Sequence, residues 1–432
     1  MAAISEISRN AIDYLKSKEG VKGDVNVSFT EQHEVTIKDG KLTLLRTLFD
    51  NNISIKVIKD NKEGKVRLND TSDESIRNGI DDAIKTAESG NEDEAFCIAP
   101  GMEPEKFKFG ITEPDIEKLI ERTIELSEDI KKRHKNIKMM EMFANHIKGH
   151  SIFANTLGTI DETEYGYYEL VLEYAGNDGE KTSGISFSQI AIKDLDKPFI
   201  ELGSIDKDLS DAENSINPIS VEDKFEGDVI FTPDCSKKML TFLLGNTITD
   251  SVVLEKTSLW LEKLGQQVLS PKLTISSKPF DDRIVDFEVH TSDGYRSKDY
   301  TAIENGILKS FAVSQYTSNK TGIERAANTS MSLVVEPGDI SFEEMVKGVK
   351  KGLIVGAVSC GYPGTNCELS GVAKNAFLIE DGKIVGAVKE TMISGNLIDM
   401  FNNVKAISKE QILSGYTVIP YIQVGGVTIS GS

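Results

Sequence analysis

VNVSFTEQHEVTIKDGKLTLLRTLFDNNISIKV, residues 25–57, is the most informative stretch of this sequence for its architecture. Apolar and polar side chains alternate over 25–29 and again over 35–37, which is the period of a strand with one buried face. The Asp39-Gly40 dipeptide then predicts a tight turn, and the alternation returns at the end of the stretch. The sequence therefore predicts that the first half of the chain contains a meander of antiparallel strands.

Helical patterns flank this meander on both sides. Apolar residues at helical spacing predict one helix that ends at Gly20 and another between a capping box at Thr71 and Glu74 and a stop at Gly90. Residues 90–112, rich in Gly, Pro and acidic side chains, predict a long loop before a third helix. Such helices are expected to cover one face of the sheet.

A change of pattern near residue 220 predicts two domains. Residues 211–227 are polar with little periodicity, and the apolar VIF at 229–231 begins a new strand. We therefore expect an N-terminal domain at 1–218 and a C-terminal domain at 219–432. The predicted fold class is α+β, with antiparallel sheet and covering helices in each domain and the C-terminal domain more β-rich.

The second domain combines a few helices with many strands. Asp234 is a candidate N-cap for an apolar helix, and a further helical stretch is expected around Trp260. Hairpin turns are predicted at Asn-Gly 305–306 and Asp-Gly 381–382, and Ser341 begins a capping box. The remainder is strand-like.

Composition excludes several classes of function. The 49 Lys and Arg against 69 Asp and Glu give 49 − 69 = −20, a charge that repels a phosphate backbone, so we expect no nucleic-acid binding. No apolar run reaches the roughly 18 residues of a membrane span, and the N-terminus lacks a signal-peptide pattern, so a cytoplasmic location is expected. The four scattered cysteines do not suggest a disulfide framework.

Few residues are candidates for metal or acid–base chemistry. The histidines are His33, His134, His146, His150 and His290. His33 with Glu34 lacks the second histidine of a metalloprotease motif, and we expect His146 and His150 to be surface residues, with His134 and His290 structural. Nucleophile elbows, P-loops and dinucleotide fingerprints are absent. The glycine-rich 358–371 is interpreted either as a set of tight turns or as backbone that a ligand approaches closely.

AKNAFLIEDGKIVGAVKETMISGNLIDMFNNV, residues 373–404, resembles the closing signature of the TldD/PmbA family, above all in SGNLIDMF at 394–401. Further similar segments occur in the family's order: EVTIKDGKL at 34–42, NTLGT at 155–159, GQQVLS at 265–270, SDG at 292–294, IENGIL at 303–308 and EPGDISFEEMVKGVKKGLIV at 336–355. The resemblance thus extends over nearly the whole chain.

The resemblance implies a division of labour between two kinds of subunit. TldD-type members carry a zinc-binding HExxxH helix, PmbA-type members, also called TldE, lack it, and the two assemble into a heteromeric zinc metalloprotease. Counting back from 265–268, the motif's histidine positions fall on Thr241 and Asn246 and its glutamate position on Phe242. None of these supplies the metal site or the general base, so the chain resembles the PmbA type. We expect it to bind no metal and to have no catalytic residues of its own, with zinc only in a TldD-type partner.

What the chain supplies to such a partner is expected to be part of the substrate cleft. Strands and glycine-rich backbone would hold an extended, unfolded peptide, and the candidate cleft positions are Gly361, Gly364, Asn366 and Asn396. For Asn396, a turn or capping role is the competing interpretation. Cys360 lies near the position of a cysteine associated with the zinc site in TldD-type members.

Two other functions remain open at this level. One is a non-enzymatic protein-binding modulator, in keeping with the family's label of modulator of DNA gyrase. The other is a hydrolase with Cys360 or Cys367 as nucleophile, which lacks a recognisable histidine partner. Without a TldD-type paralogue, the chain is expected to form homo-oligomers through its partner-facing surface.

Overall fold

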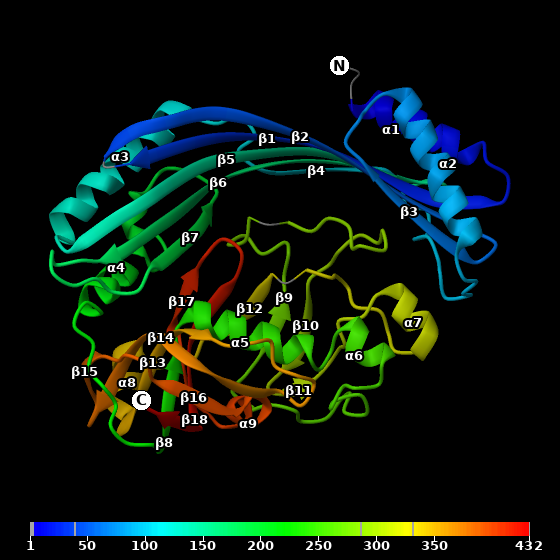
Figure 1. The fold of residues 1–432 in the computed structure, drawn as a ribbon. Coiled ribbons are helices and arrows are strands. Elements are labelled where there is room, and N and C mark those ends of the chain that lie inside the picture. The colour runs from blue at the N-terminus through cyan, green and yellow to red at the C-terminus, as the bar shows by residue number, and fades with distance from the viewer. Residues whose placement is uncertain (1–3, 39, 286, 331, 432) are drawn as a thin grey trace.

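Two β-sheets, one above the other, organise the molecule (Figure 1). The computed structural model describes residues 4–38, 40–285, 287–330 and 332–431. With about 23% helix and 42% strand, segregated into sheets and covering helices, the predicted α+β class is confirmed. Asp39 of the predicted Asp39-Gly40 turn lies outside the described residues.

The N-terminal sheet is built from unusually long strands. Its strands are β1 (Val21–Lys38), β2 (Lys41–Lys59), β3 (Lys62–Leu68), β4 (Glu105–Gly110), β5 (Ile137–Asn155), β6 (Ile160–Gly176) and β7 (Ser186–Ile192). Their order is β3-β2-β1-β5-β6-β4, and β7 also pairs with β6. The pairs are antiparallel except for β4 with β6. The predicted meander is therefore present as β1, β2 and β3.

Helices cover one face of this sheet at both of its ends (Figure 1). They are α1 (Ile4–Lys16), α2 (Asp73–Ser89), α3 (Ile116–Arg133), the 3-10 turn η1 (Phe199–Glu201) and α4 (Ile205–Asn214). At one end α1 and α2 pack on Val25 and Val27 of β1. At the other end α3 and α4 belong to the core that includes Val35 of the same strand. The apolar side chains on one face of β1 thus contribute to both hydrophobic cores of this half.

Three predictions for this half were wrong. The N-cap of α2 is Ser72, whose hydroxyl accepts the amide of Ser75, so Thr71 does not form a capping box. The expected loop at 90–112 contains β4, which is ordered by parallel pairing with β6. His146 is fully buried, where its Nε2 lies 2.7 Å from the Ile111 carbonyl oxygen.

The C-terminal sheet contains more strands than the N-terminal one, but they are shorter. They are β8 (Phe225–Phe231), β9 (Ile275–Ser277), β10 (Tyr300–Glu304), β11 (Ile307–Leu308), β12 (Leu333–Val335), β13 (Lys351–Ser359), β14 (Glu368–Glu380), β15 (Lys383–Ala387), β16 (Met392–Asn396), β17 (Val404–Leu413) and β18 (Val418–Ser430). Because β18 also pairs with β8, the strands β8, β13, β14, β16 and β18 form a closed ring. The longest strands here have 13 residues, against 19 in the N-terminal sheet.

The helices of this half are α5 (Pro233–Gly245), α6 (Asp250–Leu254), α7 (Gln315–Thr321), α8 (Phe342–Gly348) and α9 (Leu397–Asn402). The capping box at Ser341 is confirmed, as are the hairpins at 305–306 and 381–382. The N-cap of α5 is Thr232, so Asp234 lies in the first turn. The stretch around Trp260 forms turns instead of a helix, with the indole fully buried.

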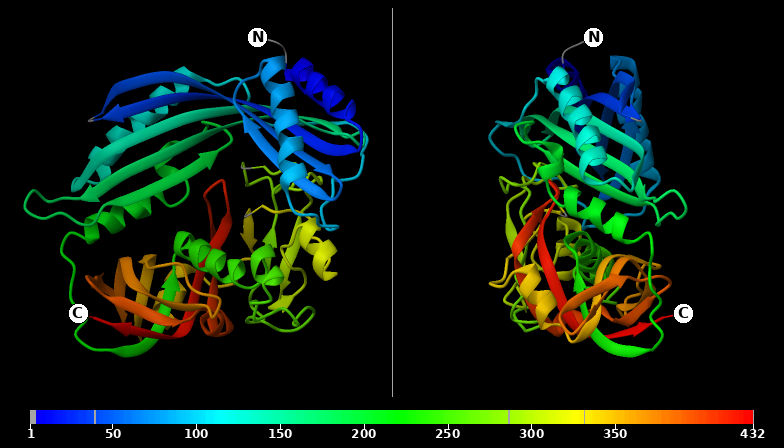
Figure 2. Two further views of the ribbon diagram at one scale, coloured as in Figure 1. Left: turned by 45° about the vertical axis from the view of Figure 1, so that its right-hand side comes forward. Right: turned by 90° about the vertical axis from the view of Figure 1, so that its left-hand side faces the viewer.

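The segment that joins the two halves runs down one side of the molecule from α4 to β8 (Figure 2). The predicted boundary at 218/219 lies in this segment. Buried ion pairing also connects the halves, because Asp161 of β6 accepts hydrogen bonds from Arg296 at 2.7 and 2.8 Å and lies 2.8 Å from Nε2 of His290. Within the described residues, every helix is too short or too polar to cross a bilayer.

Candidate functional site

Helix α5 and the loop 360–367 form one structural unit. The helix begins with Thr232 as N-cap and Pro233 at its first position, a favourable start because proline has no amide hydrogen to leave unpaired. One face is apolar and packs into the C-terminal core through Leu240 and Leu243. The helix ends at Gly245, and Asn246 is its C-cap. The loop 360–367 connects β13 to β14 and meets α5 at this end.

The three positions singled out by the family resemblance lie at this contact. Asn246 is buried, and its Nδ2 donates to the carbonyl oxygens of Phe242 at 3.0 Å and Pro363 at 3.1 Å. The Phe242 ring meets the Tyr362 ring edge to face, with 4.9 Å between centroids. Thr241 is partly exposed one residue earlier. Asn246 and Phe242 therefore fasten the loop to the helix.

These side chains do not fit a zinc ion. Phenylalanine has no donor atom, threonine offers one weak hydroxyl ligand, and the amide nitrogen of Asn246 already donates to two carbonyl groups. Zinc sites in proteins need three or four nitrogen, sulfur or carboxylate ligands. At the positions where a metal site would require histidines, α5 therefore has side chains that pack and anchor the loop.

The four predicted cleft positions occupy the loop and its surroundings. Gly361, Gly364 and Asn366 are exposed in the loop. Asn396 is the N-cap of α9, because its Oδ1 accepts the amide of Ile398 at 2.9 Å. Its Nδ2 donates to the carbonyl oxygen of Asn366 at 2.7 Å. The structure thus brings Asn366 and Asn396 into contact and gives Asn396 the capping role; contact of the four positions with substrate stays a prediction.

The cysteines near the loop are poor candidates for nucleophiles. Cys367 is buried, and burial raises the pKa of its thiol to about 11, so the thiolate is disfavoured at neutral pH. Cys360 is partly exposed, with its Sγ 3.8 Å from the Val358 carbonyl oxygen. The described histidines have their contacts elsewhere: three lie on β1 and β5, His134 contacts α4, and His290 contacts Asp161.

A cavity of about 540 Å³ lies between the two halves, beside the N-terminus of α5. Its lining comes from Tyr174, Gly184, Ile185, Ser186, Phe187, Asp208 and Asp211 on the N-terminal side, and from Thr232, Asp234, Gly356, Ala357, Ser359, Lys374 and Asn375 on the other. Ser359 directly precedes Cys360, so the glycine-rich loop starts at the rim of this cavity. The predicted loop and the cavity are therefore neighbouring parts of one region.

The cavity is acidic, and its carboxyl groups are perturbed. Burial raises the pKa of Asp208 to about 7, although Ser204 and Ser188 donate hydrogen bonds to it at 2.8 and 3.1 Å. Burial also raises the pKa of Asp211, which pairs with Lys207. Sequence analysis missed these residues because they come from separate elements and form no motif. The only local sign of the cluster is the three-residue spacing of Asp208 and Asp211, which places both carboxyl groups on one face of α4.

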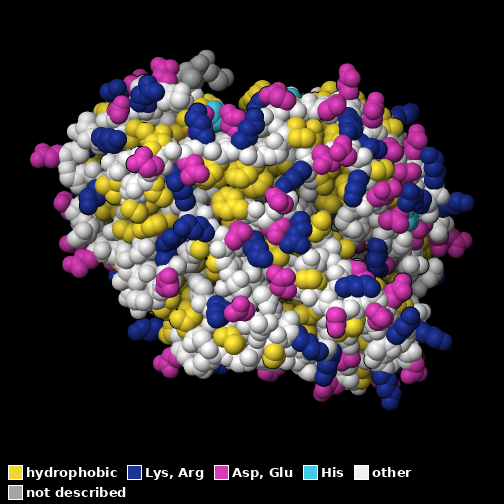
Figure 3. All heavy atoms as spheres, turned by 180° about the vertical axis from the view of Figure 1, so that it is seen from behind, with side chains coloured by type: hydrophobic (Ala, Val, Ile, Leu, Met, Phe, Trp, Pro, Cys, Tyr) yellow, Lys and Arg dark blue, Asp and Glu magenta, His cyan; other side chains and the backbone are white. Residues whose placement is uncertain are grey.

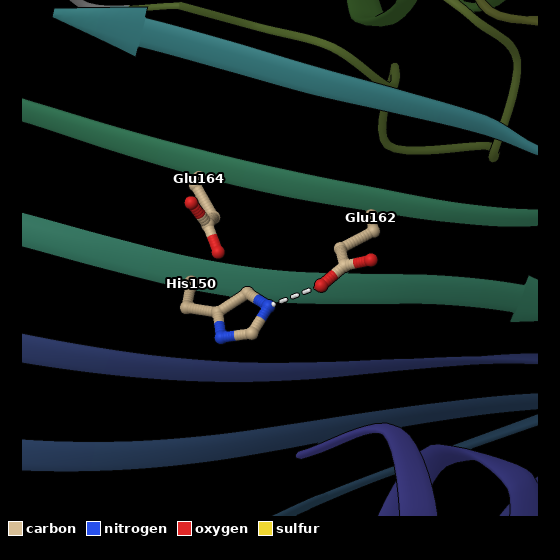
Figure 4. Close-up of side chains that lie close together, drawn as sticks. All are labelled: His150, Glu162 and Glu164. Carbon is tan, nitrogen blue, oxygen red and sulfur yellow. Dashed lines mark hydrogen bonds and ion pairs between the residues drawn. The ribbon is translucent and has the colours of Figure 1, made fainter. Parts of the chain in front are cut away.

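A second cluster of titratable groups lies on the N-terminal sheet. His150 of β5 and Glu162 and Glu164 of β6 point toward one another (Figure 4), with ligand atoms within 4.8 Å. His150 Nε2 is 2.9 Å from Glu162, and Lys106 forms an ion pair with the same carboxylate at 2.6 Å. Cross-strand pairing of His150 with Glu164 explains the proximity. The ammonium of Lys106 already neutralises one of the two carboxylates.

Two family models match this sequence. The one described as the PmbA/TldA metallopeptidase C-terminal domain matches residues 225–431, and the one described as PmbA/TldA metallopeptidase domain 1 matches residues 23–88. The first range begins with β8 and includes all strands of the C-terminal sheet, α5 and the loop. The second contains most of the predicted meander.

Individual proteins are similar over the full length. A protein named metalloprotease from Methanocaldococcus jannaschii is 27% identical over 424 residues, 92% of each chain. TldE from Thermococcus kodakarensis has a similar structure, with a TM-score of 0.83 at 19% identity over 100% of both chains. A proposed modulator of DNA gyrase from Bacteroides thetaiotaomicron gives 0.86 at 20% identity over 99% of both chains. At these identities, the structural similarities establish the fold alone.

Proposed function

This chain belongs to the PmbA/TldD family, and from that premise we propose that it is the zinc-less, TldE-type subunit of a two-subunit metalloprotease. In this proposal a TldD-type paralogue supplies the zinc and the general base. The present chain supplies part of the surface that holds an extended peptide. The family membership makes proteolysis the relevant reaction, and the residues of α5 support the zinc-less one of the two roles.

The observation that carries the proposal is the state of α5. Asn246, at a position where the family motif has a metal ligand, is buried and bonded to the carbonyl oxygen of Pro363. Phe242, at the position of the general base, packs on Tyr362. A zinc site with its general base would need Thr241, Phe242 and Asn246 all replaced and the loop released.

The cavity between the halves is our candidate for the peptide-holding surface. On one side it is lined by β7, which pairs only with β6 among the described strands. The amide of Ala191 near the end of β7 donates to the Ser414 carbonyl oxygen at 2.9 Å, so the outer edge left for strand addition is the part at the cavity, residues 186–189. Phe187 of β7 is 66% exposed beside this edge. On the other side lie Gly356 and the start of the glycine-rich loop. The acidic lining favours peptides that carry Lys or Arg.

Zinc content and peptide hydrolysis test the proposal together. The purified chain should contain no stoichiometric zinc and should not cleave an unstructured peptide substrate. Mixing it with the HExxxH-bearing paralogue from the same genome should produce zinc-dependent hydrolysis that exceeds the activity of that paralogue alone. Stoichiometric zinc or hydrolysis by this chain alone would refute the proposal. Peptide binding without any hydrolysis in the mixture would favour the non-enzymatic modulator instead.

A further inference from the structure

A strip of the N-terminal sheet between its two groups of helices carries titratable side chains. On one face of β5, Ile152 packs in the core with α1 and α2, and Ala144 packs in the core with α3 and α4. His150 points to the same face between them, because side chains alternate along a strand. Its side chain is 29% exposed, so solvent reaches it. Seen from behind, histidine side chains are visible at the top of the molecule, among lysine and acidic side chains (Figure 3).

Strand pairing gathers His150, Glu162 and Glu164, and we call these three residues the β5–β6 cluster. Glu164 of β6 lies directly opposite His150. Glu162 is two residues earlier on the same strand, so its side chain points to the same face. The three side chains converge from two strands whose pairing is unbroken from Glu141 to Ala154 of β5 (Figure 4). The cluster is therefore positioned by the sheet itself, as a preorganised binding site requires.

The distances within the β5–β6 cluster suit a metal ion. Nε2 of His150 is 2.9 Å from an oxygen of Glu162, and the three candidate ligand atoms lie within 4.8 Å of one another. Metal–ligand bonds of about 2.1 Å in a tetrahedral arrangement place two ligand atoms about 3.4 Å apart. Small rotations of the flexible glutamate side chains cover the difference. An imidazole nitrogen with two carboxylate oxygens is a ligand set for Zn²⁺ and neighbouring transition metals, whereas Mg²⁺ and Ca²⁺ prefer oxygen ligands alone.

Lys106 competes with a metal ion for the β5–β6 cluster. Its ammonium pairs with Glu162 at 2.6 Å, but the lysine side chain is 83% exposed. Exposed ion pairs of this kind contribute little to stability, so the ammonium can turn to solvent when another cation binds. A doubly charged ion bonded to all three residues of the cluster replaces a single contact of a singly charged group. The ion pair thus shows where the cluster attracts a cation.

From these features we propose that the β5–β6 cluster binds an exchangeable divalent transition-metal ion of the Zn²⁺ type. Its protein ligands are Nε2 of His150 and one oxygen each from Glu162 and Glu164. Water completes the coordination, because three protein ligands leave a tetrahedral position open. A cavity of about 320 Å³ beside α1 borders Glu162 and gives room for this water. The bound ion joins β5 to β6 at a site outside α5, which departs from the sequence-based expectation that the chain binds no metal.

Calorimetric titration with Zn²⁺ tests the β5–β6 cluster. The chelator-treated chain should bind one Zn²⁺ with micromolar affinity, and His150→Ala and Glu164→Gln should each weaken binding by at least about 10-fold because each removes a ligand. Lys106→Gln should tighten binding by about 3–10-fold, because it removes the competing ammonium. Mg²⁺ in large excess should not displace the ion.

His33→Ala is the matched control. His33 lies on the same face of the sheet and pairs with Glu31 at 2.9 Å, with its side chain 22% exposed. Among the described residues, this pair has no second carboxylate close enough to complete a metal site. The substitution should therefore leave the affinity for Zn²⁺ unchanged. Circular dichroism should show all variants folded, since the substituted side chains are partly or largely exposed.

Several outcomes would overturn the metal site. They are no saturable binding of one Zn²⁺ per chain, an affinity unchanged in His150→Ala, an equal loss in His33→Ala, weaker binding in Lys106→Gln, or displacement of the ion by Mg²⁺. Chelator removes an ion of micromolar affinity, so the zinc content expected under the proposed function is unaffected. Zinc held at α5 would persist in His150→Ala, whereas zinc at the β5–β6 cluster would not, and this separates failure of one proposal from failure of the other.

Discussion

Replacing Asp161 by asparagine should loosen the connection between the two halves of the molecule. The carboxylate is fully buried and accepts hydrogen bonds from two nitrogens of Arg296 and from the amide of Glu105, with His290 also in contact. Hydrogen bonds from Arg296 and His290, acting against burial, lower the pKa of Asp161 to about 2 from 3.8. That difference corresponds to about 2 kcal/mol of stability at neutral pH.

The expected loss for Asp161→Asn is about 2–4 kcal/mol, because the substitution also leaves Arg296 with a weaker partner in a buried site. The effect depends on pH with a defined sign. The folded-state pKa lies below the unfolded one, so the stabilisation is fully present above about pH 4 and is lost as the pH falls from 3.8 toward 2. The gap between variant and wild type should therefore be widest at pH 7 and should narrow below pH 4.

Urea unfolding gives the measurement. Trp260 is the only tryptophan and is buried in the C-terminal half, so its fluorescence follows that half while circular dichroism follows both. Glu105→Gln is the matched control, since Glu105 also pairs with Arg296 but is 51% exposed, and its loss should cost less than about 1 kcal/mol. If Asp161→Asn is no less stable than Glu105→Gln at pH 7, the buried ion pair does not hold the halves together.

Three further predictions concern the cavity, the thiols and the surface charge. Because the folded-state pKa of Asp208 is raised from 3.8 to about 7, native stability should fall by about 2–3 kcal/mol between pH 5 and pH 8. Asp208→Asn keeps an acceptor for Ser188 and Ser204 and should flatten this pH dependence in urea titrations, whereas equal slopes would contradict the buried carboxyl. Iodoacetamide followed by mass spectrometry should label Cys360 before Cys367 in the native chain, since only the first is partly exposed. At physiological salt the chain should show no affinity for duplex DNA in an anisotropy titration, because its charge is −20.

Features with local physical causes could be predicted from the sequence. The alternation from Val25 to Ile37 predicts a strand because one face must be buried, and Ser341 caps its helix through its own neighbours. Asn-Gly at 305–306 closes a hairpin for the same kind of reason.

Features with distant causes could not be predicted in this way. β4 lies in an acidic, proline-containing segment and is a strand because β6 pairs with it. His146 is buried by Tyr168 and the Ile111 carbonyl, neither of which is near it in sequence. The acidic cavity arises because α4 meets the N-terminus of α5 across the two halves. Thr241, Phe242 and Asn246 were found only through the family resemblance.

The contact of Asn246 with the loop permits a last prediction. Asn246→Ala removes two hydrogen bonds and leaves the Pro363 carbonyl without its donor, at a cost of about 1–2 kcal/mol. Amide hydrogen exchange should then accelerate in 360–367, while Thr241→Ala, a partly exposed position on the same helix, should leave the loop unchanged. If the loop shapes a peptide cleft, the first variant and not the second should lower hydrolysis by the two-chain mixture.

Indistinguishable exchange in the two variants would show that Asn246 does not anchor the loop. Position 246 would then have neither the metal ligand of the family motif nor a role in holding the loop. Faster exchange with unchanged hydrolysis would instead separate the anchor from the cleft and place the peptide elsewhere, on β7 and the acidic cavity wall. Asn246 thus stands where the family motif has a metal ligand, and its side chain holds the loop 360–367 in place instead. Hydrogen exchange measures the effect of Asn246 on the loop, and hydrolysis by the two-chain mixture measures the effect of the loop on the peptide cleft.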